Sequence, residues 1–253
     1  MGALPDARRL GAHGRRLLRP PAGALSRGRH RPRGERGLAM IRTLFVDAGG
    51  VLYNNINEET DFLERVADRY GANRAEIARR VEASAPEYES GRCHVHQVLA
   101  RLVADGHRPP ADTPTETRWL DHAYLGSVRP YHDSFRALRE LRQERPEVTV
   151  VLTNNEAEHW DRLKDETYGH FALFDMLYSS WRVGRVKPAL SFFTAALHGC
   201  RATAAETLLI DDRATVLRVG AELGMHTLHV STPEVFAHRL GRTVRGDVLP
   251  SMP

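Results

Sequence analysis

The chain has 253 residues, 42% of them hydrophobic, which allows one large domain with a substantial core or a domain that carries an insertion. Its formal net charge is +4, but residues 1–40 hold ten arginines against two acids, a net +8, so residues 41–253 carry a net −4. The part expected to fold is mildly acidic, which argues against nucleic acid as a partner. Because no apolar stretch is long enough to cross a bilayer, we expect no membrane partner either.

Residues 1–39 form an Arg-rich segment without apolar periodicity, and we expect this tail to be disordered. An organellar transit peptide, an arm for an acidic partner or nucleic acid, and a segment foreign to the native protein all fit its composition. We favour the last interpretation, because Met40 directly precedes the first predicted strand and prolines interrupt any long amphipathic helix. Cys93 and Cys200 are too few for a disulfide framework, so the default location is the cytoplasm.

The first clear element is an apolar run over residues 41–46, which ends abruptly at Asp47 and is followed by Gly49 and Gly50. Its Val, Ile and Phe content predicts a buried strand. Asp47 then lies at the carboxyl end of that strand, where open parallel sheets bind their ligands. The same pattern is also typical of a loop in which an aspartate caps a turn, so the rest of the chain has to decide.

The apolar spacing after this strand is helical as far as residue 128, with a turn expected at 88–92. From residue 129 onward, helical patterns alternate with β-rich apolar runs, and a short helix is expected from Pro233. The runs that predict strands are 148–152, 174–178, 207–210 and 226–230.

This alternation predicts an α/β fold with a doubly wound, parallel, Rossmann-like sheet and a helical cap inserted after the first strand. The expected division is a core domain over 40–53 and 129–240, a cap over 54–128, and a flexible C-terminal tail over 241–253.

Polar residues stand at the ends of three predicted strands: Asp47, Thr153-Asn154 and Asp211-Asp212. Since the carboxyl ends of parallel strands share one edge, these side chains should meet, with Lys187 from a nearby loop. Converging carboxylates repel one another, and Mg²⁺ relieves this because it prefers oxygen ligands. A carboxylate held in this way beside a phosphate can act as a nucleophile.

Four motifs resemble those of the haloacid dehalogenase (HAD) superfamily, in the right order over roughly 41–232. They are Val46-Asp47-Ala48-Gly49-Gly50-Val51-Leu52, Leu152-Thr153-Asn154, Val186-Lys187-Pro188 and Leu209-Ile210-Asp211-Asp212. The stretch from Phe174-Asp175 to Lys187-Pro188, with Gly224-Met225, is similar to the branch that contains the phosphatase domain of soluble epoxide hydrolase.

The resemblance implies a role for each matching position. Asp47 matches the nucleophile, which also binds Mg²⁺, and Lys187 matches the lysine that neutralises the nucleophile and the phosphate. Thr153 and Asn154 match the hydroxyl and the amide that hold the phosphoryl group. The implied metal positions are Asp47, Asp211, the Gly49 carbonyl, and Asp212 as a ligand through water. Asp212 can alternatively pair with Lys187.

Taken alone, two of these residues have simpler interpretations. Lys187 can be a solvated surface lysine, and Asp212 can cap the helix that follows it. The occurrence of all the motifs together favours the functional interpretation.

Gly49 departs from the family pattern, because phosphatases of the family usually carry a second aspartate at that position. That aspartate protonates the leaving alcohol, and such general acid–base help is typically worth about 10²–10⁴-fold in rate. Either hydrolysis is slow, or the substrate has a good leaving group, or another acid substitutes. Tyr53, Asn54, His94 and His96 are candidate substitutes, although a structural role suits each of them.

The leading prediction is therefore a Mg²⁺-dependent phosphatase that acts on a small phosphorylated metabolite, as a monomer or homodimer. A metal-independent 2-haloacid dehalogenase is an alternative, but dehalogenases typically carry an aromatic residue in place of Gly49. A second alternative, suggested by Gly49, is a catalytically weak protein that binds ligands. The sequence does not name the substrate, because residues of the predicted cap would select it.

Overall fold

The computed structural model describes residues 41–104 and 114–245. The tail predicted at 1–39 and residues 246–253 lie outside the described residues.

Five parallel strands in the described residues form one sheet, in the order β3-β2-β1-β4-β5. They are β1 (Thr43–Val46), β2 (Thr149–Leu152), β3 (Met176–Leu177), β4 (Thr207–Asp211) and β5 (His226–His229). This sheet confirms the predicted doubly wound α/β fold. The central position of β1 puts Asp47 in the middle of the carboxyl edge.

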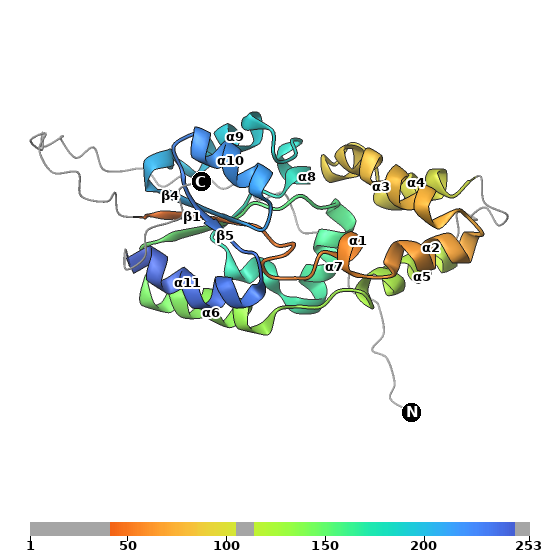
Figure 1. Ribbon diagram of the computed structural model, residues 1–253, viewed down its shortest axis with the longest axis horizontal. Helices are drawn as coiled ribbons and strands as arrows, with labels where there is room; N and C mark the ends of the chain where they lie inside the picture. The colour runs from red at the N-terminus through yellow and green to blue at the C-terminus, as the bar shows by residue number, and fades with distance from the viewer. Residues whose placement is uncertain (1–40, 105–113, 246–253) are drawn as a thin grey trace, which may run out of the picture. The chain divides into compact units, whose positions relative to one another are not determined.

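Helices cover both faces of this sheet, with α6 and α11 on one face and α9 and α10 on the other (Figure 1). Successive strand residues alternate between the two apolar layers: Leu44 and Val46 pack in one, and Phe45 packs in the other with Phe192 and Phe193. The helices are α6 (His132–Glu144), α7 (Glu158–Tyr168), α8 (Ser180–Val183), α9 (Leu190–Cys200), α10 (Ala214–Glu222) and α11 (Pro233–Arg245), with 3₁₀ turns at His170–Leu173 and Ala204–Glu206.

Between β1 and α6 lies a block of helices, called here the helical insertion. It consists of α1 (Ile56–Glu59), α2 (Phe62–Tyr70), α3 (Arg74–Glu89), α4 (Val95–Leu102) and α5 (Pro114–Leu125). Its apolar side chains belong to the same buried cluster as one layer of the sheet domain. Phe62 and Tyr124, for example, both pack against Trp160 of α7. The insertion and the sheet domain therefore share a continuous core.

Two predicted boundaries were wrong. The turn expected at 88–92 starts later, because α3 continues to Glu89 and buries Tyr88 in the core before Gly91 turns the chain with a φ of 71°. The helix expected to be short from Pro233 has 13 residues, so the predicted tail does not begin at 241. Phe236 and Leu240 are buried where α11 packs along α6, and this packing carries the helix past Gly241.

In the part of the chain that the structure describes, none of the helices is long and apolar enough to cross a membrane.

Candidate active site

Strand register brings three of the predicted polar residues together at the carboxyl edge. Val46 of β1 lies opposite Leu152 of β2 and Ile210 of β4, so the residues that follow them are neighbours. Backbone hydrogen bonds continue past the paired residues, from Thr153 N–H to Val46 (2.9 Å) and from Asp47 N–H to Ile210 (3.0 Å). Asp47, Thr153 and Asp211 therefore lie side by side on a rigid support.

Lys187 reaches this edge from the loop before α9. Its Nζ lies 2.6 Å from Asp211 Oδ2 and 3.1 Å from Asp47 Oδ1, and its side chain is 3% exposed. Asn155 holds the lysine backbone on both sides: its Oδ1 accepts from Lys187 N–H at 2.8 Å, and its Nδ2 donates to Lys187 O at 2.9 Å. The interpretation of Lys187 as a solvated surface lysine is wrong, because the side chain is buried between two carboxylates.

Burial dominates the electrostatics of these carboxylates. Burial raises the pKa of Asp47 to about 6, against the attraction of Lys187 and with the repulsion of Asp211. Burial likewise raises the pKa of Asp211 and of Asp212. For Lys187, the attraction of Asp211 and Asp47 outweighs desolvation and raises the pKa. One lysine thus faces three carboxylates, and the site has an excess of negative charge.

A divalent cation fits this donor set. Asp47, Asp211 and Asp212 each offer a carboxylate oxygen within 4.8 Å of the others. In the described structure, Oδ1 of Asp212 is buried without a hydrogen-bond partner. Three carboxylates with an unpartnered buried oxygen are the kind of oxygen-only site that Mg²⁺ takes. The Gly49 backbone belongs to the adjacent cavity walls.

Asp212 does not pair with Lys187, contrary to one of its two predicted roles. Its Oδ2 accepts a hydrogen bond from Asn55 Nδ2 at 2.8 Å, while Lys187 Nζ contacts Asp211 and Asp47. The helix-capping interpretation is also wrong, because α10 is capped at Arg213. The Arg213 N–H donates to Asp211 Oδ1 at 2.9 Å, so Asp211 satisfies that backbone group instead.

Thr153 and Asn154 are both buried, but only the Asn154 side chain makes a hydrogen bond. Thr153 Oγ1 has no hydrogen-bond partner among the described residues, which leaves its hydroxyl free to bind a ligand oxygen. Asn154 Nδ2 instead donates to Asp161 Oδ1 at 3.0 Å. This hydrogen bond fixes the loop after β2, while Asn154 Oδ1 has no hydrogen-bond partner among the described residues and the residue lines the smaller cavity.

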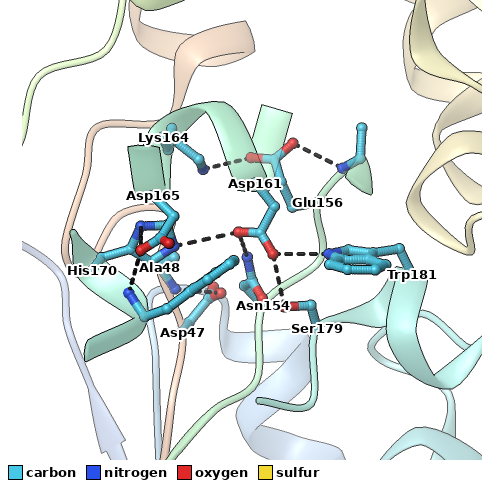
Figure 2. Close-up of polar contacts among 12 residues, drawn as sticks. Asp47, Ala48, Asn154, Glu156, Asp161, Lys164, Asp165, His170, Ser179 and Trp181 are labelled. Atoms are coloured by element: carbon cyan, nitrogen blue, oxygen red, sulfur yellow. Dashed lines mark hydrogen bonds and ion pairs between the residues drawn. The ribbon is translucent and has the colours of Figure 1, made fainter. Parts of the chain in front are cut away.

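Asp161 of α7 is the centre of a buried polar network (Figure 2). Besides Asn154, its carboxylate accepts from Ser179 Oγ and Trp181 Nε1, each at 2.8 Å, and lies 3.4 Å from His170 Nε2. Burial alone would raise the pKa of Asp161, but the contact with His170, the charge of Lys164 and the hydrogen bond from Trp181 lower it to about 2. The carboxylate is therefore ionised at neutral pH and rigidly held, and it orients the residue next to Thr153.

Two cavities adjoin this edge, with volumes of about 130 Å³ and 270 Å³. Gly49, Asn55 and Glu89 line both, while Asp47 and Lys187 line the larger one. Asn55 Oδ1 lies 2.8 Å from where a Cβ on Gly49 would be, so Asn55 occupies the space of the missing side chain.

Glu89 is a functional candidate that sequence analysis missed. It lies at the end of α3, and burial with the repulsion of Glu156 raises the pKa of its carboxyl to about 7. The sequence placed it in a turn, where an acid usually faces solvent. Only its raised pKa and its place in both cavity walls identify it.

The four candidate substitute acids take structural positions. Tyr53 is buried against the rings of Phe135 and His170, and burial raises the pKa of its hydroxyl. The Asn54 side chain donates to Ser127 O at 3.1 Å and accepts from Arg129 N–H at 2.7 Å, which ties the two ends of the helical insertion together. His94 and His96 lie at the start of α4, away from the lining of the two cavities.

A model of the haloacid dehalogenase-like hydrolases matches residues 41–224 of this chain. The chain belongs to this hydrolase family. The match spans β1 to α10 and includes every predicted site residue. The narrower resemblance to the phosphatase domain of soluble epoxide hydrolase stays a prediction.

Similar proteins include the sesquiterpene phosphatase astK of Aspergillus oryzae, which is 31% identical over 106 residues. That match covers 42% of this chain and 53% of the relative, so the chain spans about half the length of the curated relative that it matches.

Solved structures of HAD enzymes share the fold. One is an enzyme of Bacteroides thetaiotaomicron in complex with magnesium and inorganic phosphate (TM-score 0.60, 20% identity, 75% of this chain and 93% of that chain). Another is a predicted HAD-like hydrolase of Porphyromonas gingivalis (TM-score 0.63, 21% identity, 82% and 99%). The L-2-haloacid dehalogenase of Xanthobacter autotrophicus with covalently bound chloropropionic acid is also similar (TM-score 0.54, 16% identity, 84% and 85%).

Proposed function

We propose that the protein is a Mg²⁺-dependent phosphatase that hydrolyses a small phosphorylated metabolite through an aspartyl-phosphate on Asp47. The observation that carries the proposal is the buried lysine between two carboxylates, beside a third whose Oδ1 is unpartnered. This combination suits a dianionic phosphate, because it supplies one cation from the chain and an oxygen-ligand site for another. The phosphatase relative and the solved structure with magnesium and phosphate support the same choice.

Asp47, Asp211 and Asp212, with the Gly49 carbonyl, would hold the metal. Bound there, Mg²⁺ would neutralise phosphate oxygens and reduce the repulsion between the nucleophile and the substrate. Lys187 would hold a phosphoryl oxygen with its buried ammonium, and the Thr153 hydroxyl would donate to another.

Asp47 is fixed through one oxygen only. Its Oδ1 accepts from Ala48 N–H at 2.7 Å and contacts Lys187 at 3.1 Å, so we assign the attack on phosphorus to Oδ2. As the Oδ2–P bond forms, the ester P–O bond breaks and the leaving oxygen takes a proton. Water then attacks the aspartyl-phosphate, loses a proton, and releases inorganic phosphate and the free carboxylate.

We assign Glu89 as the group that gives and recovers this proton. It lines both cavities with Gly49, and its pKa of about 7 leaves a large protonated fraction at neutral pH. Because Glu89 belongs to the helical insertion, residues 54–128 would act as a cap that completes the site and selects the substrate. We place this activity in the cytoplasm, in a monomer or homodimer.

Phosphate release from a panel of phosphate monoesters, including a sesquiterpenyl monophosphate, tests the proposal when run with and without Mg²⁺. We expect turnover that EDTA abolishes and that Asp47→Asn reduces by at least about 10³-fold. Phosphate release that survives EDTA, or that Asp47→Asn leaves unchanged, would refute the mechanism.

Two further measurements separate the alternatives. Chloride release from 2-chloropropionate without metal would point to the dehalogenase reaction. Absence of both phosphate release and chloride release, with intact Mg²⁺ binding, would point to a ligand-binding role.

A further inference from the structure

A second cluster of metal-ligating side chains lies outside the site around Asp47. It consists of His96 on α4, Asp121 on α5 and His159 on α7. Both histidines place Nε2 at 2.8 Å from the same oxygen, Oδ1 of Asp121. Side-chain exposure is 11% for His96, 19% for Asp121 and 31% for His159, so the cluster is largely buried yet reachable from solvent.

The proposed phosphatase reaction does not use this cluster. None of its three residues lines either of the two cavities described above, and none lies in the four motifs that carry the family resemblance.

We propose that His96, Asp121 and His159 form a binding site for a divalent transition metal, with Zn²⁺ as its best fit. Their ligand atoms lie within 4.8 Å of one another. Zn²⁺ with bonds of about 2.0–2.1 Å in a tetrahedron needs ligand atoms roughly 3.3 Å apart. The 2.8 Å separations from Nε2 to Oδ1 therefore have to open by only about half an ångström.

Metal entry requires a free lone pair on each Nε2, the ring nitrogen that faces the Asp121 oxygen. A neutral histidine can carry its proton on Nδ1 instead of Nε2, which frees the Nε2 lone pair for the metal. Asp121 supplies a carboxylate oxygen, which Zn²⁺ accepts as a ligand beside imidazole nitrogen. Three protein ligands leave a fourth position for water.

His94 supports the site without being a ligand in this arrangement. Its Nδ1 accepts the N–H of His96 at 3.3 Å and caps α4, which keeps its proton on Nε2. Its ring centroid lies 5.0 Å from that of His96 and 5.1 Å from that of His159. The crowded rings restrict the rotation of both ligands.

The two metal sites differ in the chemistry of their donors. Asp47, Asp211 and Asp212 offer oxygen atoms only, which suits Mg²⁺, whereas imidazole nitrogen favours Zn²⁺. Because α4 and α5 belong to the helical insertion and α7 belongs to the sheet domain, Zn²⁺ bound here would cross-link the two parts.

The test is a calorimetric titration of the untagged full chain with Zn²⁺ in excess Mg²⁺, with thermal unfolding measured in parallel. We expect one Zn²⁺ per chain and, at a hundredfold excess over Kd, a Tm increase of about 5–10 °C. The double variant His96→Gln/His159→Gln should bind at least about 100-fold more weakly and lose the Tm shift. The matched control His198→Gln/His238→Gln removes two exposed imidazoles and should keep both the Zn²⁺ affinity and the Tm shift of the wild type.

Asp121→Asn provides a second variant in case the double variant does not fold, because the amide oxygen can still accept one histidine hydrogen bond. It should also weaken Zn²⁺ binding. Absence of Zn²⁺ binding by the wild-type chain would overturn the proposal. Equal binding by the wild type and the ligand variants would overturn it as well.

Discussion

The chain contains two lysines, Lys187 and Lys164, and the structure buries both beside carboxylates. Lys187 lies between Asp47 and Asp211, at 3.1 Å and 2.6 Å, in the wall of the larger cavity. Lys164 of α7 lies 2.6 Å from Glu156 Oε2, and its Nζ is 5.1 Å from the centre of the Tyr53 ring. One lysine therefore faces an excess of negative charge, whereas the other has one close carboxylate partner.

This difference separates Lys187, which we propose acts in catalysis, from Lys164, which we propose stabilises the fold. A lysine shared by two buried carboxylates leaves negative charge uncompensated, which is costly unless a cation or substrate completes the site. Lys164 makes one close ion pair, with Glu156 Oε2, to which Tyr124 adds a hydrogen bond at 3.0 Å, and its charge also acts on the buried Asp161. Burial alone, which the two lysines share, does not distinguish the lysine that we propose for catalysis.

The largest effect is expected from Lys187→Met. The variant leaves two buried carboxylates facing each other and removes the cation that would hold the phosphoryl group. We expect phosphate release per folded molecule to fall by about 10³-fold or more. The free energy of unfolding should fall by about 3–5 kcal/mol without Mg²⁺, and Mg²⁺ should restore part of it. Steady-state assays and urea unfolding measure the two effects, and wild-type turnover by the folded variant would contradict the role of Lys187.

Lys164→Met should lower stability by a similar amount but have little effect on catalysis. It leaves the largely enclosed Glu156, 16% exposed, without its cation, so we expect a loss of about 3 kcal/mol in urea unfolding. The matched double variant Lys164→Met/Glu156→Gln removes both charges and should recover much of that loss. Turnover by folded Lys164→Met should fall by less than about tenfold. A loss as large as that of Lys187→Met would show that both lysines bind the substrate.

The sequence predicted the sheet and the edge residues because they follow local rules. Asp47, Thr153 and Asp211 each end an apolar run, and the carboxyl ends of parallel strands meet wherever the strands pair. Lys187 was predicted from its motif, but its position depends on two hydrogen bonds between its backbone and the Asn155 side chain, which no sequence pattern predicts.

Residues that act across the boundary between the helical insertion and the sheet domain could not be predicted. Glu89 reaches the cavities only because α3 packs toward the sheet domain and contacts α8. Asp161 has the sequence context of a surface acid on α7, and only tertiary packing buries it. His96, Asp121 and His159 come from three helices, and no local periodicity relates their positions.

Glu89→Gln tests the proposed proton donor, which lines both cavities. Its pKa of about 7 lies above the ordinary value, so the carboxyl is protonated below pH 7 and loses its proton above it. Turnover of alkyl phosphates by the wild type should therefore fall as the pH rises through about 7. The variant should lose this limb and be about 10²-fold slower. With p-nitrophenyl phosphate, whose leaving group needs no proton, the two proteins should differ little. Equal losses on both substrates would assign Glu89 to binding.

Asp161→Asn should give the smallest of these effects. It tests the buried network near Lys164 rather than the site around Lys187. The folded-state pKa of about 2 lies below the ordinary 3.8, so the ionised carboxylate stabilises the fold above pH 4 and loses this contribution as the pH falls toward 2. We expect urea unfolding at pH 7 to show a loss of about 2 kcal/mol in the variant, and about half that difference at pH 3.

The exposed Glu166 on the same helix supplies the matched control for Asp161. Glu166→Gln should leave the free energy of unfolding unchanged at both pH 7 and pH 3. A difference for Asp161→Asn that stays constant between pH 7 and pH 3 would show that its hydrogen bonds, rather than its charge, hold Asn154 in place.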